Sequence, residues 1–285
     1  MYDVIIIGNG PAGISAGLYL KRANKNILIV SKMNSALKKA EKIENYYGVE
    51  SITGDELYNL GIIQAKRLNI PMEEDEVINI GYNESNKKFL VTTVNNEFEA
   101  SNVILATGTN RMTPKIKGIK DFEGKGVSYC AICDAFFYRN KNVAVIGNGN
   151  YAIHEAKILK PIANSVTILT NGKRMVENRD SSDFDIDESN IREFRGNNVI
   201  EEVEFENNNK RKIDGVFIAI GTASSVDLAK KIGALVKNNN IVIDENMQTT
   251  VKGMYACGDC TGGLLQVNKA VYEGAKAALS IIKNK

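Results

Sequence analysis

The sequence predicts an α/β fold made of two similar domains, and three observations lead to this prediction. A run of β-branched residues, a glycine-rich turn and a helical pattern follow one another at the start of the chain. The same order returns about 139 residues later, counted from Gly8 to Gly147. The last segments then return to the first domain. We therefore expect two Rossmann-like (three-layer) dinucleotide-binding domains, the second inserted into the first.

Composition limits the class of protein and of partner. A chain of 285 residues is long enough to form two domains of ordinary size. Its 36 basic and 34 acidic residues leave a net charge of +2, so neither nucleic acid nor an anionic membrane is expected as a partner. No apolar run approaches the roughly 20 residues of a membrane helix. We expect a cytoplasmic protein.

The beginning of the chain has the pattern of a dinucleotide-binding unit. Residues 3–7 are β-branched without alternation, which is typical of a central parallel strand. A Gly-x-Gly-x-x-Gly turn at residues 8–13 opens a helix, and a second strand is expected at 26–30. Glycines in such a turn permit close backbone approach, and the amides of the helix N-terminus bind a pyrophosphate. Ser31 and Lys32 stand where an acidic residue would hold the ribose, so ribose contacts must come from elsewhere.

The rest of the first domain combines one helix with a meander of strands. Thr53-x-x-Glu56 is a capping box that begins a helix, and Pro71 stops it. Thr107 and Gly108 close the last strand before the second domain. Strands are expected at residues 76–80, 88–94, 97–100 and 102–106.

The first unit then repeats. A strand at residues 142–146 leads into a glycine turn at 147–152, a helix that ends at Pro161, and a strand at 165–169. A duplicated nucleotide fold within one chain is typical of flavoproteins that use two dinucleotides.

The remaining segments complete both domains. Residues 174–195 are acidic and weakly patterned, so we expect a solvated surface connection there. Further elements are expected at residues 199–205, 213–220, 241–243, 249–250, 254–259 (a strand and turn) and 266–282 (a helix). The predicted boundaries are residues 1–113 and 245–285 for the flavin-binding domain, and 114–244 for the inserted domain.

Four cysteines occur as two Cys-x-x-Cys pairs. Cys130 and Cys133 precede the second glycine turn and are followed by Asp134. A thiolate is the nucleophile of disulfide exchange, and a Cys-x-x-Cys at the start of a structured turn can lower the pKa of one thiol. Cys257 and Cys260 flank a Gly-Asp turn, where small residues are tolerated beside a cofactor. Alternatives are an auxiliary disulfide, a Cys₄ zinc or iron–sulfur site, and, for the first pair, buried cysteines without chemistry.

In combination these motifs resemble the low-molecular-weight thioredoxin reductases over nearly the whole chain, and most closely the ferredoxin-dependent flavin thioredoxin reductases. The resemblance implies a homodimer that binds FAD in the domain made of both chain ends. It also implies a redox disulfide in the inserted domain and thioredoxin as the electron acceptor. The matching segments are Gly8-x-Gly10-Pro11-Ala12-Gly13, Ile43 to Gly48, Ala106 to Gly108, Cys130 to Asp134, Phe136 to Arg139, and Cys257 to Asp259.

The resemblance further implies roles for single residues. Cys133 would face the flavin, Cys130 would attack the disulfide of thioredoxin, and Asp134 would move a proton to or from the leaving sulfur. Leu265 replaces an arginine that the family often places just before the glutamine of the closing helix. No metal ligands are assigned. The expected FAD contacts are Gly8, Gly10, Pro11, Ala12, Gly13, Asn45, Thr107, Gly108, Gly258, Asp259 and Gln266.

The second nucleotide site departs from the family pattern where NADPH would bind. The family has arginines after this strand that bind the 2′-phosphate, and no acidic residue is present for an NADH ribose instead. Lys173 and Arg174 are the alternative cations. The positions concerned hold Thr170, Asn171, Gly172 and Val176.

In the glycine turn itself, Tyr151 replaces a small residue and Asn148 replaces a glycine. Tyr151 could fill the space of the pyrophosphate, or point away and leave weak NADPH binding.

These losses favour reduced ferredoxin as the electron donor. The reduction potential of a plant-type ferredoxin is about −400 mV and that of thioredoxin is about −270 mV. Transfer of two electrons from ferredoxin to thioredoxin is therefore favourable by roughly 6 kcal/mol. The lysines at 115, 117, 120 and 125 could steer an acidic ferredoxin. One alternative is an NAD(P)H-dependent thioredoxin reductase with a weakened nucleotide site. Another, of a different class, is a metal-binding or redox-sensing protein that uses the four cysteines.

Overall fold

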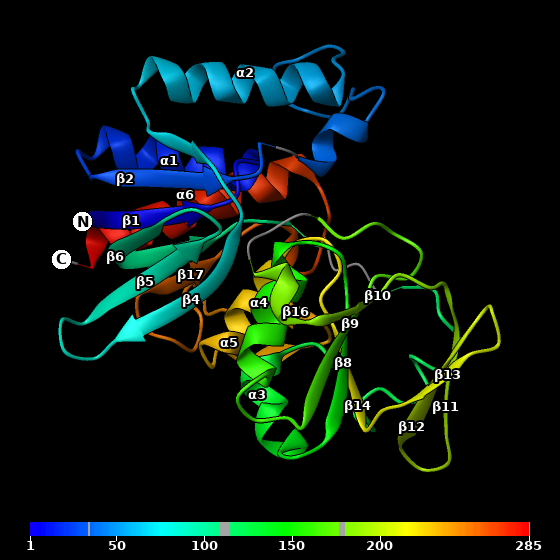
Figure 1. Cartoon of the computed structure of the whole chain (residues 1–285). Coiled ribbons are helices and arrows are strands. Elements are labelled where there is room, and N and C mark those ends of the chain that lie inside the picture. The colour runs from blue at the N-terminus through cyan, green and yellow to red at the C-terminus, as the bar shows by residue number, and fades with distance from the viewer. Residues whose placement is uncertain (34, 109–113, 177–179, 285) are drawn as a thin grey trace. The chain divides into compact units, whose positions relative to one another are not determined.

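Figure 1 shows a computed structural model of the chain, which describes residues 1–33, 35–108, 114–176 and 180–284. Met1–Asn110 and Ser224–Lys285 form one compact unit, and Arg111–Ala223 form a second. The α/β class, with the second unit inserted into the first, is confirmed. The predicted boundary at residue 113 lies outside the described residues, and the chain returns to the first unit before the predicted residue 244. None of the described helices has the length and apolar composition needed to cross a membrane.

The first unit is built on a seven-stranded sheet of order β3-β2-β1-β6-β5-β4, in which β17 also pairs with β6. Its β1, β2, β3, β6 and β17 are paired in parallel, whereas β4, β5 and β6 form an antiparallel meander. The central strands are apolar because both of their faces are covered. The strands are β1 (Tyr2–Ile7), β2 (Ile27–Ser31), β3 (Met72–Glu74), β4 (Val77–Asn83), β5 (Lys88–Thr93), β6 (Glu97–Leu105) and β17 (Met254–Ala256).

β6 is one continuous strand, although the sequence predicted two. Its first half pairs with β5 up to Ala100, and its second half pairs with β17 from Val103 to Leu105. The first half is partly exposed and the end is fully buried. The apolar pattern therefore changes in the middle of β6, which is why the sequence predicted two strands where the structure has one.

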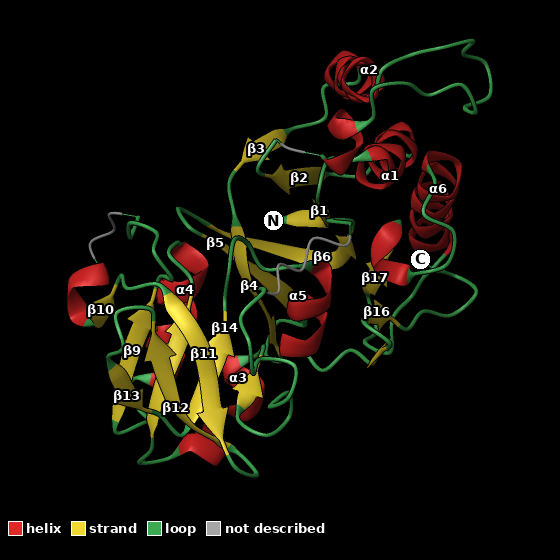
Figure 2. Cartoon of the chain, turned by 90° about the vertical axis from the view of Figure 1, so that its right-hand side faces the viewer, coloured by secondary structure: helices red, strands yellow, loops and turns green. Residues whose placement is uncertain are grey.

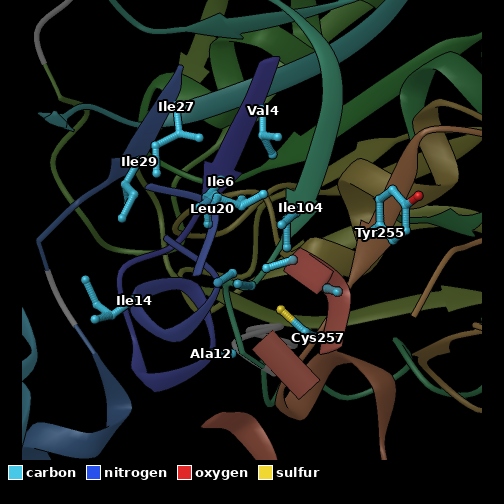
Figure 3. Close-up of a cluster of buried hydrophobic side chains, with 14 of the residues drawn as sticks. Val4, Ile6, Ala12, Ile14, Leu20, Ile27, Ile29, Ile104, Tyr255 and Cys257 are labelled. Carbon is cyan, nitrogen blue, oxygen red and sulfur yellow. The ribbon is translucent and has the colours of Figure 1, made fainter. Parts of the chain in front are cut away.

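Helices from both ends of the chain cover this sheet. α1 (Pro11–Arg22) and α6 (Val267–Lys283) lie side by side in Figures 1 and 2. Their approach depends on Gly274, where an added Cβ would lie 2.1 Å from the carbonyl oxygen of Ala12. Figure 3 shows part of the core of this unit, including Val4, Ile6, Leu20, Ile27, Ile29, Ile104 and Tyr255.

α2 (Gly54–Arg67) begins with the predicted capping box. The amide of Glu56 donates to Thr53 Oγ1 at 3.2 Å, and the amide of Thr53 donates to Glu56 Oε2 at 2.9 Å. The Thr53 amide and the Thr53 hydroxyl, which donates to Glu56 Oε2 at 2.8 Å, lower the pKa of the Glu56 carboxyl. The remaining short elements are η1 (Ala36–Lys39), β15 (Val236–Lys237), β16 (Asn240–Ile241) and η4 (Asp259–Thr261).

α5 (Ser225–Lys231) was not predicted. It begins with a second capping box, in which Ser224 and Asp227 bond reciprocally. Lys231 Nζ donates to the carbonyl oxygen of Ile78 at 3.0 Å, which links α5 to β4. Residues that the sequence assigned to the inserted domain therefore pack within the first unit.

The second unit has a parallel sheet of order β10-β9-β8-β14-β7. α4 (Asn150–Leu159) connects β8 to β9, as the glycine turn predicted. A three-stranded antiparallel sheet packs through Phe194 and Val203 against Ala144 of the parallel sheet (Figure 2). The strands are β7 (Val127–Ser128), β8 (Asn142–Ile146), β9 (Ser165–Leu169), β10 (Asp185–Asp187), β11 (Ile191–Gly196), β12 (Ile200–Phe205), β13 (Lys210–Lys212) and β14 (Gly215–Ile218).

The prediction of a surface connection at residues 174–195 was wrong. The segment holds η3 (Ser181–Asp183), β10 and most of β11. β10 is an edge strand whose Asp185 pairs with Arg211 of β13. Residues that look solvated in the sequence therefore form a strand, because an edge strand exposes one side and can pair its charges.

Candidate active site

The glycine turn after β1 forms a crevice at the start of α1. Gly8 has a φ of 109°, and a Cβ there would lie 2.4 Å from the carbonyl oxygen of Ala106. A Cβ on Gly13 would lie 1.9 Å from the carbonyl oxygen of Gly8, so packing requires both glycines. At Gly10 the nearest atom to an added Cβ is Ser35 Oγ at 3.5 Å, which leaves room for a ligand.

α1 begins without a side-chain cap. Gly10 is its N-cap residue, Pro11 follows, and no side chain bonds to the amides of the first turn. The amides of Ala12 and Gly13 thus belong to the positive end of a twelve-residue helix. This crevice fits the pyrophosphate of FAD, the predicted cofactor.

The Gly-Asp turn after β17 packs on the same crevice. Gly258 has a φ of 83°, and a Cβ there would lie 3.0 Å from Ala12 Cβ. Figure 3 shows Cys257 beside Ala12. Burial raises the pKa of the Asp259 carboxyl, although the ammonium of Lys269 opposes this shift.

Lys269 and Glu273 of α6 hold this turn. The two side chains form a largely buried ion pair with Nζ and Oε2 3.0 Å apart. Glu273 Oε2 accepts from the Gly258 amide at 2.8 Å, and Lys269 Nζ donates to the Gly258 carbonyl oxygen at 3.0 Å. Sequence analysis missed both residues. Their only signal is a Lys–Glu spacing of four, which is equally common on a solvated helix face.

Two predicted FAD contacts that are distant in sequence lie together. Asn45 Nδ2 donates to Gln266 Oε1 at 3.3 Å, and Asn268 Nδ2 donates to the carbonyl oxygen of Asn45 at 3.3 Å. The loop of Asn45 is thereby attached to the start of α6.

Thr107 is held by α5 rather than left free for a ligand. Its Oγ1 lies 2.7 Å from Ser225 Oγ, and its amide donates to Ser225 Oγ at 3.1 Å. Gly108 has a φ of 74°, and no atom of the described residues lies within 4 Å of an added Cβ. The Thr107 side chain has a structural partner that the sequence did not reveal.

In the second unit, Cys130 and Cys133 form a disulfide with Cα atoms 5.3 Å apart. Cys130 is the N-cap of α3 (Ala131–Asp134), and its Sγ accepts a hydrogen bond from the Cys133 amide at 3.3 Å. Cys130 is buried and Cys133 is exposed. The predicted redox pair is therefore bonded, and Cys133 is its accessible member.

Asp134 is fixed from β7. Ser128 Oγ donates to Asp134 Oδ2 at 2.6 Å and accepts from the Cys130 amide at 3.1 Å. One hydroxyl thus joins the first cysteine to the candidate acid. Ser128 was missed, because a serine two residues before a cysteine has no distinctive pattern.

An apolar surface patch lies next to the disulfide. Ile132 within the pair is 46% exposed, and Phe136 and Phe137 of η2 (Ala135–Tyr138) are 71% and 68% exposed. Arg139 lies over the Phe136 ring at 5.7 Å. Large exposed aromatic side chains beside a reactive group are typical of a protein-binding surface.

Residues 2–274 match the family described as pyridine nucleotide-disulphide oxidoreductases. The chain belongs to this family. It is 34% identical over 301 residues to the thioredoxin reductase of Aquifex aeolicus, covering 99% of this chain and 93% of that protein. It is 35% identical over 300 residues to the thioredoxin reductase of Ureaplasma parvum, covering 98% and 95%.

Solved structures agree with this assignment. The atypical thioredoxin reductase TRi from Desulfovibrio vulgaris Hildenborough matches with a TM-score of 0.93 and 37% identity, covering 100% of this chain and 99% of that one. A ferredoxin-flavin thioredoxin reductase from Clostridium acetobutylicum matches with a TM-score of 0.72 and 31% identity, covering 99% and 97%. The resemblance to low-molecular-weight thioredoxin reductases is confirmed, and so is FAD as the cofactor, since this family consists of FAD-binding flavoproteins.

The second glycine turn differs from the pattern of the pyridine nucleotide-disulphide oxidoreductases, because protein atoms contact it. Asn148 Nδ2 donates to the carbonyl oxygen of Arg174 at 3.1 Å, and the Val176 amide donates to the carbonyl oxygen of Asn148 at 2.9 Å. Tyr151, in the first turn of α4, is only 2% exposed. The chain after β9 thus lies against the turn that would otherwise approach a pyrophosphate.

The remaining cysteines of this family member are free thiols. Cys257 and Cys260 are both buried and do not form a disulfide. Among the described residues, no group of three or more His, Cys, Asp or Glu is arranged to hold a metal ion. The Cys₄ alternative therefore finds no support.

His154, which lies on the first turns of α4, is half-buried.

Proposed function

We propose that the protein reduces the disulfide of a thioredoxin-like partner through Cys130 and Cys133, with FAD as cofactor and reduced ferredoxin as electron donor. The observation that supports the reductase most directly is the Cys130–Cys133 disulfide, whose turn is tied to Asp134 through Ser128. Relatives named thioredoxin reductases also match nearly the full chain.

The exchange needs only residues of the second unit. In the reduced pair, the thiolate of Cys130 attacks the partner's disulfide, and one partner sulfur leaves as a mixed disulfide forms. Cys133 then attacks the Cys130 sulfur, releases the second partner sulfur and restores the Cys130–Cys133 disulfide. Two electrons and two protons reach the partner, and Asp134 is the acid proposed to deliver a proton to a leaving sulfur. FAD, when bound, supplies the electrons that reduce the pair again.

The apolar patch of Ile132, Phe136 and Phe137 supports a protein rather than a small molecule as the acceptor. These side chains lie within a few residues of Cys133, and the guanidinium over Phe136 adds a hydrogen-bond donor at the edge of the patch. Aromatic residues with an adjacent arginine are enriched in protein interfaces. A thioredoxin that docks there would lie next to the exposed Cys133, so attack by Cys130, which is buried in the oxidised pair, requires that the redox turn rearrange after reduction.

The covered second glycine turn supports ferredoxin as the donor. In the turn where the pyrophosphate of a nicotinamide cofactor would dock, Asn148 bonds to residues 174–176, and Tyr151, which replaces a small residue, is buried. The arginines that would bind a 2′-phosphate are also absent from the sequence after β9. A one-electron donor needs no such site, and the name of the Clostridium acetobutylicum neighbour includes ferredoxin.

Anaerobic mixing of the flavin-loaded protein with each donor tests this proposal. Reduced ferredoxin should bleach the flavin absorbance rapidly, and thioredoxin added in excess should then be reduced. NADPH and NADH should bleach the flavin at a far lower rate. Rapid bleaching by either nicotinamide would assign the protein to the NAD(P)H-dependent alternative.

The acceptor half of the proposal is tested separately with Cys130→Ser and Cys133→Ser. Both variants should still be bleached by ferredoxin and should lose thioredoxin reduction to the background level. With Cys133→Ser, the remaining Cys130 should form a stable mixed disulfide with thioredoxin, visible by mass spectrometry. Full thioredoxin reduction by either variant would contradict the assigned chemistry.

We also propose that the protein is a homodimer. Several large apolar side chains of the first unit are exposed on helices, which suits association through that unit. Light scattering at several concentrations should give a mass near twice that of the 31.3 kDa chain. The side chains are Tyr19, Leu60, Ile63, Tyr272 and Leu279.

A further inference from the structure

We propose that Glu155 is a positioning residue of disulfide exchange, whose buried carboxylate fixes the redox turn and, through its charge, opposes formation of the Cys130 thiolate. The proposal rests on the proposed function, because it concerns the pair that performs the exchange. It adds a second carboxyl group to the redox turn, besides that of Asp134, which bonds to Ser128.

The contact that supports the proposal joins two chain segments across the second unit. Glu155 Oε2 accepts a hydrogen bond from the Ala131 amide at 2.8 Å, and both residues are buried. Glu155 is 1% exposed. Ala131 is the residue that directly follows Cys130, so the carboxylate bonds to the backbone next to the first sulfur. α3 and α4 are in contact at this point.

The position of Glu155 within α4 is unusual for an acidic residue. The buried row of this helix includes Tyr151, Glu155 and Leu159, which are four residues apart. Packing of such a row calls for an apolar side chain, since a buried carboxylate is costly unless it is hydrogen-bonded. The bond to Ala131 is one of the interactions of this carboxylate, and an apolar side chain could not make it.

The bond also brings a carboxylate to the residue next to Cys130. In the structure, Cys130 Sγ accepts from the Cys133 amide, the N3 amide that an N-cap side chain reaches, and the Ala131 amide is bonded to Glu155. A Cys130 thiolate would keep the Cys133 amide but would form near a negative charge. Nearby like charges disfavour the ionised form of a thiol. The reduced pair is then less reactive toward unspecific electrophiles near neutral pH.

Other charged or titratable groups lie on the elements around the turn, and none replaces Glu155. Asp134 bonds to Ser128 on the same turn, and burial raises the pKa of the Tyr138 hydroxyl, which keeps it neutral. Arg139 lies over the Phe136 ring. The groups to be considered are Tyr129, Asp134, Tyr138, Arg139, His154 and Glu155.

The test compares Glu155→Gln with the wild-type protein, both flavin-loaded and fully reduced under anaerobic conditions. The rate of Cys130 alkylation by iodoacetamide is followed against pH, with the modified peptide identified by mass spectrometry. Glutamine keeps the shape and an acceptor oxygen but removes the charge. We expect the midpoint of the alkylation profile to fall by about one pH unit, which is about tenfold more thiolate at a pH below both midpoints.

Two further variants separate charge from structure. Glu155→Asp retains the charge and should keep the midpoint near the wild-type value. Glu201→Gln removes an exposed charge of the same unit and should change nothing. An unchanged midpoint in Glu155→Gln, with flavin content and thermal unfolding like those of the wild type, would overturn the proposal. So would an equal shift in Glu201→Gln.

The alkylation readout is independent of the partner. If the wild-type protein failed to reduce thioredoxin, the proposed function would fall, while a shifted midpoint would still show that Glu155 acts on Cys130. If thioredoxin were reduced with the same pH profile by wild type and Glu155→Gln, and the alkylation midpoints coincided, the role of Glu155 would be refuted and the proposed function would stand.

Discussion

Cys257 and Cys260 repeat the spacing of the redox pair in a different environment. Burial raises the pKa of the Cys257 thiol well above its ordinary value and that of Cys260 to about 12. The Cys260 thiol donates to the carbonyl oxygens of Leu105 at 3.6 Å and Cys257 at 3.4 Å. A buried, protonated thiol is a poor nucleophile. The Cys-x-x-Cys spacing alone therefore does not identify a redox site.

This difference predicts the number of reactive thiols. In the fully reduced native protein, we expect two of the four cysteines, Cys130 and Cys133, to react with a thiol reagent at neutral pH. Cys257 and Cys260 should react only after denaturation, because burial raises the pKa of both thiols, whereas Cys130, although buried, lies in a short turn with the exposed Cys133. A double replacement of Cys257 and Cys260 by alanine should leave thioredoxin reduction near the wild-type rate. Four reactive thiols in the native protein would contradict the buried environment.

Single residues of the site differ in how visible they are to sequence analysis. Cys130 and Cys133 were found because cysteines at this spacing are rare and have a distinct chemistry. Ser128, Glu155 and Lys269 were missed. Each of these acts through hydrogen bonds to backbone or side chain, and such bonds follow from the fold rather than from a local pattern.

At the scale of elements, the link between β6 and α5 offers a test of how the FAD crevice is supported. Ser225 Oγ bonds to the amide and the side chain of Thr107, and Ser225 is fully buried. Ser225→Ala would leave the partly buried Thr107 amide without this acceptor, at a cost of about 1–3 kcal/mol in the free energy of unfolding. We also expect FAD to be released faster on dilution, measured by the rise in free-flavin fluorescence.

Thr53→Ala is the matched control for Ser225→Ala. Thr53 caps α2 within the same unit, and loss of its cap should cost about 1 kcal/mol of stability. The rate of FAD release should change less than in Ser225→Ala. Equal release rates in the two variants would mean that Ser225 supports the fold in general and not the crevice.

The three-stranded sheet of the second unit gives a prediction for acid stability. Glu193 of β11 pairs with Lys117 at 2.7 Å and with Arg195, and these hydrogen bonds lower the pKa of the Glu193 carboxyl below 4.5. Because the folded pKa lies below the unfolded one, the carboxylate contributes stability above the ordinary pKa. This contribution is lost as the pH falls through the folded pKa.

We therefore expect the urea midpoint of Glu193→Gln to fall less than that of the wild type between about pH 6 and about pH 3. At neutral pH the variant should be the less stable of the two. Glu201→Gln, which removes an exposed charge from the neighbouring β12, should follow the wild-type curve. Parallel curves for Glu193→Gln and the wild type would show that these ion pairs do not contribute to stability.

Elements were predictable where one periodicity held along the segment. The strand, glycine turn and helix of each unit, and the capped helix at Thr53, were found in this way. β10 and β11 were missed because edge strands with paired charges have no apolar face that the sequence reveals. α5 was missed although Ser224-x-x-Asp227 is a usable start signal. The helix has only seven residues, Ser225–Lys231, which is too few to show a helical period in the sequence.

At the scale of the whole molecule, the two units share the same strand, turn and helix arrangement but differ in what surrounds the glycine turn. Each has a glycine turn between a parallel strand and a helix. The middle glycine of each turn, Gly10 and Gly149, has room for a Cβ, and the second turn bonds through Asn148 to residues 174–176, in the chain after β9. Sequence repetition revealed the shared arrangement. It could not reveal the bonds of Asn148, because they depend on how the loop after β9 folds.

Association with the proposed donor should depend on salt, although the net charge of the chain is only +2. Lys115, Lys117, Lys120 and Lys125 are all exposed at the start of the second unit, and Lys117 is paired with Glu193. Charged partners attract over a Debye length of about 10 Å at 0.1 M salt, which raises the association rate at low ionic strength. The rate of flavin bleaching by limiting reduced ferredoxin should therefore fall as salt is added.

The double variant Lys120→Gln/Lys125→Gln should weaken this salt dependence and slow bleaching by about threefold to tenfold at low salt. Its thioredoxin reduction from chemically reduced protein should be unchanged, because these lysines have no part in the disulfide exchange. Lys66→Gln, an exposed lysine on α2 of the first unit, is the control. If the double variant kept the wild-type salt dependence while Lys66→Gln lost it, the donor would dock on the first unit. Electrons would then enter through a surface of the first unit and leave through the disulfide of the second unit.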